Sequence, residues 1–381
     1  MNQILLFIGL VIILCLTIKP VGKKLPFPTL LIFIALGMLL GVNGPAHIDF
    51  SDYALTETVC STALLFIMFY GGFNTNIDRA KPVAVPAVLL STLGVVITAG
   101  ITGAFAHFAL GFDWVGGLLL GSVVASTDAA SVFSVLREHS LSLRGGTDSL
   151  LEVESGSNDP VAYMLTAVLA TLAAGGDINI PMLLAKQIIL GVGLGLVIGW
   201  ASARLIEMCI RVSATAEGAH TIFLFAVAIV AYALPSYLGG NGFLSVYLAG
   251  IVLGASDITD KVELAHFFDT LTEMAEMTIF FLLGLLVTPA RLPQMLLPGL
   301  ALMAFMLFVS RPIAVGMLLA PFKTNPRQVA LVSWAGLRGA ASVVFSLFAV
   351  VAGVPGGHDL FDLVFVIAVS SIVVQGSLLP A

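Results

Sequence analysis

The chain has 381 residues, of which 59% are hydrophobic and only 10% are charged, and its formal net charge at pH 7 is −6. About a quarter of the residues of a water-soluble domain are charged, so this composition excludes a soluble globular protein. The sequence therefore predicts an all-helical polytopic membrane protein, and we expect neither an enzyme, nor a bound cofactor, nor a nucleic-acid partner.

Apolar stretches long enough to cross a hydrocarbon core of about 30 Å follow one another along the whole chain. Splitting them at charged or Gly/Pro-rich breaks predicts thirteen transmembrane helices: 2–18, 27–42, 56–72, 83–110, 114–136, 149–174, 182–205, 219–238, 241–255, 267–287, 293–320, 327–352 and 360–379. We expect a single membrane transport domain and no soluble domain. Helices 1–6 occupy about 2–174, a linker helix occupies about 182–205, and helices 8–13 occupy about 219–379.

The basic residues of the connections indicate the orientation, because Lys and Arg are enriched in cytoplasmic loops. If each loop takes the number of the predicted helix before it, the odd-numbered loops all lie on one side of the membrane. Twelve basic residues fall in or beside these loops: Lys19, Lys23, Lys24, Arg79, Lys81, Arg137, Arg144, Arg204, Arg211, Lys261, Lys323 and Arg327. On the other side are only Arg291 and Lys186, the latter just inside the linker helix. We therefore expect a multi-pass protein of the cell inner membrane with its N-terminus outside and its C-terminus in the cytoplasm.

Charged residues inside the predicted spans need partners, because a charge at the bilayer centre costs at least about 2.5 to 3.5 kcal/mol. Counted from the cytoplasmic side at 1.5 Å per residue, Asp159 lies about 15 Å deep and Arg338 about 16 Å deep. Asp128 enters from the opposite side and lies about 20 Å deep. Three charges from three helices are thus predicted to meet near the midplane. The same count places Glu276 and Arg311 at a common depth, which predicts a structural pair or, alternatively, a cytoplasmic ion funnel.

Helices 5 and 12 carry small and polar residues at mid-span, in "VASTDAAS" and "AGLRGAAS". Such stretches can unwind where they line a cavity, so both helices are predicted to be discontinuous. An offset of seven helices reverses their direction through the membrane. The sequence therefore predicts an inverted repeat of helices 1–6 and 8–13.

Helix 6 carries two polar pairs at i,i+4 spacing, Glu154 with Asn158 and Ser155 with Asp159. Pro160 lacks an N–H and therefore frees the carbonyl oxygen of Gly156 one turn earlier. Carboxylate, hydroxyl and carbonyl oxygens are the ligands that hard cations prefer, so this face of helix 6 is a candidate cation site.

Three stretches, "STDAASV", "LEVESGSNDPVA" and "WAGLRGAASVV", resemble the core signatures of the monovalent cation:proton antiporters. The pair Asn158 and Asp159 is similar to that of the electroneutral NhaP-type branch, and the surrounding "ESGSNDP" resembles its bacterial potassium/proton subgroup. The sequence departs from the commoner pattern at Ala129, where a proline is usual, and at Pro160, where a glycine is usual.

The resemblance implies a dimer in which helices 5 and 12 are broken and cross. It implies that Asp159 carries cation and proton alternately, with Thr127, Asp128 and Ser155 around the ion. It also implies that Glu154 pairs with Arg338 and orients Asn158 as a brace.

One carboxylate that must be charged to hold a cation and neutral to hold a proton forces the two to compete. We therefore predict one-for-one, electroneutral exchange of a monovalent cation, K⁺ or Na⁺, for H⁺ at Asp159. The alternatives are a Na⁺/H⁺ antiporter of the same fold, a cation channel, or an intramembrane aspartyl enzyme using Asp128 and Asp159.

Each site residue also has a purely structural interpretation. Asp159 could be a buried acid neutralised by Arg338, and Asp128 could be the cap of a half-helix. Thr127 and Ser155 could be packing hydroxyls, which are common between membrane helices.

Overall fold

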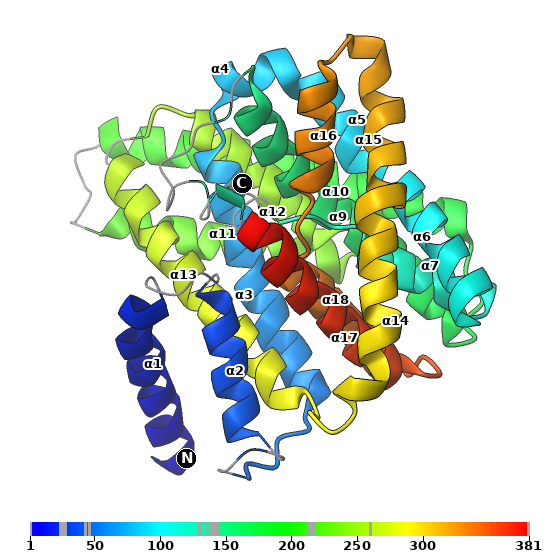
Figure 1. Cartoon of the computed structure of the whole chain (residues 1–381). Helices are drawn as coiled ribbons and strands as arrows, with labels where there is room; N and C mark the ends of the chain where they lie inside the picture. The colour runs from blue at the N-terminus through cyan, green and yellow to red at the C-terminus, as the bar shows by residue number, and fades with distance from the viewer. Residues whose placement is uncertain are drawn as a thin grey trace.

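The structure is a computed structural model that describes residues 2–22, 29–41, 44, 47–128, 132, 133, 136, 143, 145–211, 218–258 and 261–378. All regular elements in this part of the chain are helices, which confirms the all-helical prediction (Figure 1). The first half comprises α1 (Asn2–Gly22), α2 (Leu30–Leu40), α3 (Tyr53–Asn74), α4 (Ile77–Ala80), η1 (Lys81–Val83), α5 (Ala84–Leu89), η2 (Leu90–Gly94), α6 (Val95–Leu110), α7 (Trp114–Val123) and α9 (Thr147–Ala173).

The second half begins with the long helix that contains the predicted linker. It comprises α10 (Ile180–Arg211), α11 (Ala219–Tyr237), α12 (Gly242–Ala255), α13 (Lys261–Leu286), α14 (Leu292–Phe305), η3 (Met306–Ser310), α15 (Arg311–Leu319), η4 (Ala320–Phe322), α16 (Pro326–Trp334), α17 (Ala340–Val351) and α18 (Gly357–Leu378). The elements η2 and η3 are π-helical turns that lie inside the two continuous helical stretches 77–110 and 292–322.

Six helical stretches in the described ranges are long and apolar enough to cross a bilayer: Tyr53–Asn74, Ile77–Leu110, Ile180–Met208, Ala219–Tyr237, Leu292–Phe322 and Gly357–Leu378. Large apolar side chains face outward, for example Leu297 at 77% and Ile222 at 72% exposure, whereas Glu154 and Asn158 are buried. Polar groups inside and apolar groups outside are the arrangement that a hydrocarbon solvent selects. The protein is therefore a multi-pass membrane protein, and the count of thirteen spans stays a prediction.

Helix α3 lies in the interior of the bundle, packed against α12, α13 and α17 (Figure 1). Its contact with α12 is a backbone contact made by two glycines. A Cβ atom on Gly72 would collide with the carbonyl oxygen of Tyr247, and one on Gly250 would collide with that of Phe69. Small residues let membrane helices approach this closely, so α3 and α12 form a tightly joined pair.

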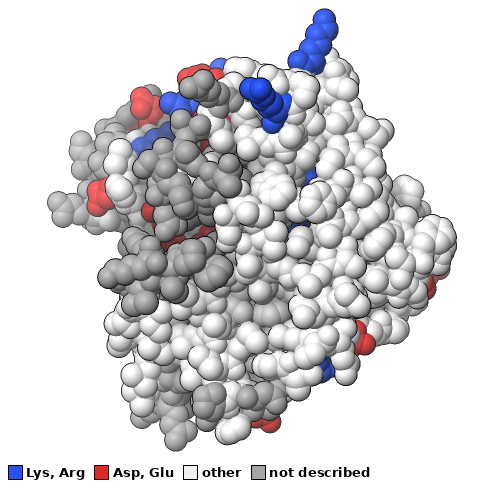
Figure 2. Space-filling view, in the orientation of Figure 1, with Lys and Arg blue, Asp and Glu red and all other residues white. Residues whose placement is uncertain are grey.

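Basic side chains are most visible along the upper edge of the molecule in Figure 2, the end at which α4 and α16 lie in Figure 1. Below this edge, the face shown is mostly uncharged. That distribution is typical of the cytoplasmic end of a membrane protein. Four of the basic residues used to predict the orientation lie outside the described residues: Lys23, Lys24, Arg137 and Arg144.

Candidate ion-binding site

Two helices are interrupted where the sequence predicts it. Helix α7 begins at a cap in which the carboxylate of Asp113 accepts hydrogen bonds from Val115 N at 3.1 Å and Gly116 N at 3.2 Å. It ends at Val123, and the chain is not helical from there to Asp128. The second interruption separates α16 from α17. A backbone hydrogen bond of 2.8 Å from Asp128 N to Leu337 O joins the two interruptions.

Asp159 of α9 faces the first interruption and is 6% exposed. The hydroxyl of Ser126 donates a hydrogen bond to its Oδ1 atom. Among the residues that the structure describes, no Lys or Arg side chain is ion-paired with Asp159. The interpretation of Asp159 as an acid neutralised by Arg338 is therefore wrong.

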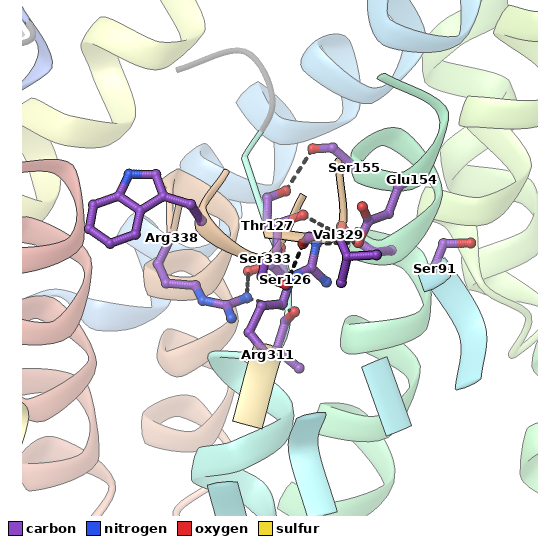
Figure 3. Close-up of polar contacts among 12 residues, drawn as sticks. Ser91, Ser126, Thr127, Glu154, Ser155, Arg311, Val329, Ser333 and Arg338 are labelled. Atoms are coloured by element: carbon purple, nitrogen blue, oxygen red, sulfur yellow. Dashed lines mark hydrogen bonds and ion pairs between the residues drawn. The ribbon is translucent and has the colours of Figure 1, made fainter. Parts of the chain in front are cut away.

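Two further side chains of α9 hold the interruption in place (Figure 3). Ser155 Oγ donates to the carbonyl oxygen of Thr127 at 2.7 Å, and Asn158 Nδ2 donates to Thr127 Oγ1 at 2.5 Å. Asn158 is fully buried. Among the described residues neither carboxylate oxygen of Glu154 has a hydrogen-bond partner, so the prediction that Glu154 orients Asn158 is wrong, and the hydroxyl of Thr127 holds Asn158 instead.

The carboxylate of Asp128 lies against the second interruption, because a Cβ atom on Gly339 would collide with it. Asp128 directly follows Thr127, whose hydroxyl accepts a hydrogen bond from Asn158, the residue before Asp159. The structure thus brings the five predicted ion-site residues together: Thr127, Asp128, Ser155, Asn158 and Asp159. Ala129, where the sequence departs from the commoner pattern, lies outside the described residues.

The predicted pair of Glu154 with Arg338 is wrong. Nη1 of Arg338 donates to the carbonyl oxygens of Ala125 at 2.8 Å and Ser126 at 2.6 Å. The physical reason is that a helix that stops inside a membrane leaves its last carbonyl groups without intrahelical donors. A buried guanidinium supplies those donors and adds a positive charge where the helix dipole is negative.

Glu154 is instead ion-paired with Arg311, whose Nη2 atom lies 2.5 Å from Glu154 Oε1. Both side chains are deeply buried, at 3% exposure for Arg311 and 1% for Glu154. No ion pair joins Arg311 to Glu276, both of which lie in the described ranges, so the predicted pairing of these two residues is wrong as well. Arg311 directly follows the π-helical turn η3. A π-helical turn shifts the direction of the side chains that follow it, which a depth count cannot register.

Several residues of this network were not predicted. Ser126 is the direct hydrogen-bond partner of Asp159. The sequence could have indicated it, because Ser126 lies in the polar mid-span stretch "VASTDAAS" beside Thr127. Behind Arg338, Ser371 Oγ accepts from Arg338 N at 3.0 Å, and Gln375 Nε2 donates to Trp334 O at 2.7 Å. These two polar residues of α18 have no sequence pattern that singles them out.

Replacing Arg338 by Met is expected to destabilise the protein by about 1.5 to 3 kcal/mol, because hydrogen bonds that involve a charged group contribute about that much. Arg338→Lys should retain part of this stability, since an ammonium still offers donors to the two carbonyl oxygens. Thermal unfolding in detergent measures both effects. Arg327→Met, at an exposed position of α16, is the control and should change little. An Arg338→Met protein as stable as the wild type would contradict the capping role.

Comparison with known proteins agrees with this geometry. Residues 9–381 match the sequence profile of the family described as "Sodium/hydrogen exchanger, transmembrane". The K(+)/H(+) antiporter NhaP2 of Shewanella sp. (strain ANA-3) is 39% identical over 382 residues, which cover 99% of this chain and 66% of that protein. The K(+)/H(+) antiporter NhaP of Alkalimonas amylolytica is 36% identical over 98% of this chain and 65% of its own length. The chain thus spans slightly less than two thirds of these relatives.

The fold has a solved counterpart. The structure of the sodium proton antiporter MjNhaP1 from Methanocaldococcus jannaschii at pH 8 superimposes with a TM-score of 0.83 and 23% sequence identity, and the match covers 99% of both chains. At that identity the likeness establishes the fold alone. Together with the profile match over nearly the whole chain, it shows that the protein belongs to the transmembrane sodium/hydrogen exchanger family.

Proposed function

We propose that the protein exchanges a monovalent cation for H⁺ across the membrane by competition at Asp159. The observation that carries this proposal is a buried carboxylate, at the meeting point of two interrupted helices, with a hydroxyl donor and no described basic partner. An acid inside a membrane that is not neutralised by a fixed cation indicates a functional site.

The surrounding groups determine what the site can bind. Ser126 and Thr127 supply hydroxyl oxygens, the interruption after α7 supplies carbonyl oxygens, and Asp128 supplies a second carboxylate. Oxygen ligands of this kind suit hard monovalent cations. When Asp159 is ionised it attracts the cation, and when it is protonated that attraction is lost, so one ligand must leave before the other binds.

Potassium is the cation that we propose first. Relatives that are 39% and 36% identical are named K(+)/H(+) antiporters, whereas Na(+)/H(+) antiporter 1 of Methanocaldococcus jannaschii is 26% identical over 360 residues. Sodium uses the same ligand types, so the assay below compares the two ions directly.

We propose a one-for-one, electroneutral stoichiometry. Asn158, next to Asp159, is an amide and does not titrate, and Glu154 is held by Arg311 at 2.5 Å. One carboxylate is then left to cycle between proton and cation, provided that Asp128 does not also release a proton. Proton flux is expected to stay the same when the membrane potential is clamped at zero with an ionophore that carries neither protons nor the transported cation. On a supported membrane, no transport current is expected. A current that scales with flux would contradict this stoichiometry.

Further architectural features belong to the same proposal. We propose that the interrupted helices cross, that the two halves form an inverted repeat, and that the protein is a homodimer of the inner membrane with a cytoplasmic C-terminus. The π-helical turns support the repeat, because η2 and η3 lie in predicted helices 4 and 11, which are again seven apart. The hydrogen bond from Asp128 N to Leu337 O supports the crossing.

The experiment that tests the proposal uses the purified chain in vesicles that contain a trapped pH dye. Addition of K⁺ or Na⁺ on one side should move protons in the opposite direction, and the ion that gives half-maximal flux at the lower concentration is the preferred substrate. Cation entry without a coupled proton movement would support a channel instead.

A further inference from the structure

Helix α9 is held between the ion site and α12. The polar side chains of the ion site leave α9 toward the first interruption. Another face of α9 packs on α12, because a Cβ atom on Gly156 would lie 2.6 Å from Tyr247 Cε2, and the ring of Tyr163 packs on Phe243 at 4.9 Å between centroids. Asp159 lies between these two contacts in the chain, so α12 supports the turn of α9 that carries it.

That turn contains a proline. Pro160 lies inside α9 immediately after Asp159. Proline has no backbone N–H, so the carbonyl group of Gly156 loses its helical hydrogen bond, and the proline ring crowds the same carbonyl group. Helices commonly bend at such a residue. The turn that carries Asp159 is therefore held less firmly by the helix itself, and its position depends on contacts from outside α9.

Asn241, the N-cap residue of α12, makes one such contact. Its Nδ2 atom donates a hydrogen bond to the carbonyl oxygen of Pro160 at 2.7 Å, and the residue is only 1% exposed. The bond joins the start of α12 to the backbone of α9 one residue beyond Asp159. Buried amide and carbonyl groups need a partner within the protein, so this bond is costly to break.

The other polar groups of Asn241 fix the asparagine itself. Its Oδ1 atom accepts from Leu244 N at 3.0 Å, and its backbone carbonyl oxygen accepts from Ser245 N at 3.1 Å. Its backbone N donates to the carbonyl oxygen of Gln187 on α10 at 3.2 Å. Because the oxygen of the amide must accept and its nitrogen must donate, these neighbours also determine the orientation of the amide group.

The helices that hold Asn241 are closely joined. A Cβ atom on Gly195 of α10 would lie 2.6 Å from the carbonyl oxygen of Ser245, and one on Gly191 would lie 2.9 Å from that of Asn241. Helix α12 makes the same kind of backbone contact with α3, as described above. Small residues permit this close packing between membrane helices. Asn241 is thus anchored in a firmly packed unit of α3, α10 and α12, with its amide directed at α9.

We propose that Asn241 is a positioning residue that holds the proline-containing turn of α9, and with it the carboxylate of Asp159, in place at the first interruption. This inference rests on the proposed exchange function. The carboxylate must meet both the hydroxyl of Ser126 and an incoming cation, and a site of this kind works only when its groups are held within a fraction of an ångström. Asn241 acts through the backbone of Pro160 and is not an ion ligand.

The variant Asn241→Ser separates this role from the capping of α12. Serine is as good an N-cap as asparagine, so the start of α12 should stay intact. It carries no amide that reaches Pro160, so the half-saturating cation concentration should rise about fivefold, the factor that corresponds to one net hydrogen bond. The maximal flux should stay near that of the wild type. Asn241→Ala also removes the cap, so it should unfold at a lower temperature without a further rise in the half-saturating concentration.

A second background tests the part played by the proline. Pro160→Ala restores the N–H group that the carbonyl oxygen of Gly156 lacks, so the turn of α9 should hold itself more firmly. In that background, Asn241→Ser is expected to raise the half-saturating concentration much less than fivefold. Comparison of the two single variants with the double variant measures this coupling.

The measurement uses the full chain in vesicles that contain a trapped pH dye, over a series of K⁺ or Na⁺ concentrations. Thermal unfolding in detergent is recorded for each protein. Asn179→Ser is the matched control, because Asn179 Oδ1 accepts from Met182 N at 3.1 Å at the start of α10, and this cap is exposed. The half-saturating concentration of Asn179→Ser should equal that of the wild type.

The proposal predicts a raised half-saturating concentration in Asn241→Ser at wild-type stability, and a smaller rise in the Pro160→Ala background. An unchanged value, a rise that follows the loss of stability from Asn241→Ser to Asn241→Ala, or an equal rise in both backgrounds would overturn it and leave the proposed exchange intact. Wild-type protein that moves no protons would overturn the exchange function and the positioning role with it. If Asn241→Ala does not fold, the comparison of Asn241→Ser with Asn179→Ser decides the question.

Discussion

Replacing Asp159 by Asn is expected to reduce cation-driven proton flux to that of empty vesicles. An amide of nearly the same shape cannot take up a proton and carries no charge to hold a cation, so both half-reactions are lost. The buried site can accommodate this substitution, because the amide oxygen of Asn can still accept the hydrogen bond from Ser126. The assay is the trapped-dye measurement with K⁺ and with Na⁺.

Asp177→Asn is the matched control, because Asp177 is an exposed acid just beyond the end of α9. Its flux should equal that of the wild type. Undiminished exchange in a correctly folded Asp159→Asn protein would show that Asp159 is structural. The carrier would then have to be sought at Asp128.

Replacing Arg311 by Met is expected to destabilise the protein by about 3 to 5 kcal/mol, because it leaves the buried carboxylate of Glu154 without its countercharge. Glu154→Gln should be costly for the same reason in reverse. The double variant Glu154→Gln with Arg311→Met should recover much of the loss, since a buried ion pair is often replaceable by neutral groups of similar volume. Unfolding midpoints of the four proteins in detergent measure the coupling.

The exposed pair of Arg204 and Glu207, at 2.9 Å with side-chain exposures of 60% and 38%, is the control. Arg204→Met should cost less than about 1 kcal/mol, because solvent screens an exposed ion pair. If the single and double variants at Glu154 and Arg311 lose stability additively, the two side chains are not coupled and the ion pair is not the source of the stability.

Depth within the membrane was predictable for most of the site. A helix rises 1.5 Å per residue, and the membrane surface sets the residue at which the count begins. Counting in this way predicted a common depth for Asp159, Asp128 and Arg338. The three come together in the structure, through Arg338 on Ala125 and Ser126 and through Asp128 on Leu337. The interruptions were predictable too, because small polar residues at mid-span are tolerated only where the backbone finds other partners.

Pairing was not predictable from the same count, because a depth says nothing about the direction in which a side chain leaves its helix. Two arginines among the described residues are buried, Arg311 and Arg338, and the family resemblance pointed to Arg338 as the partner of Glu154. The π-helical turn before Arg311 directs that side chain to Glu154, with which it forms an ion pair. The carbonyl groups left free at the end of α7 bind Arg338 instead.

The amino-acid sequence by itself determined that this protein lies in a membrane and that its elements are helices, and it predicted that Asp159, Asp128 and Arg338 come together, because composition and helical rise depend on no distant contact. Only the tertiary structure decided which arginine is paired with Glu154 and that Ser126 is the hydrogen-bond donor to Asp159. Those contacts join residues far apart in the chain, and helix packing, which local sequence does not specify, brings them together.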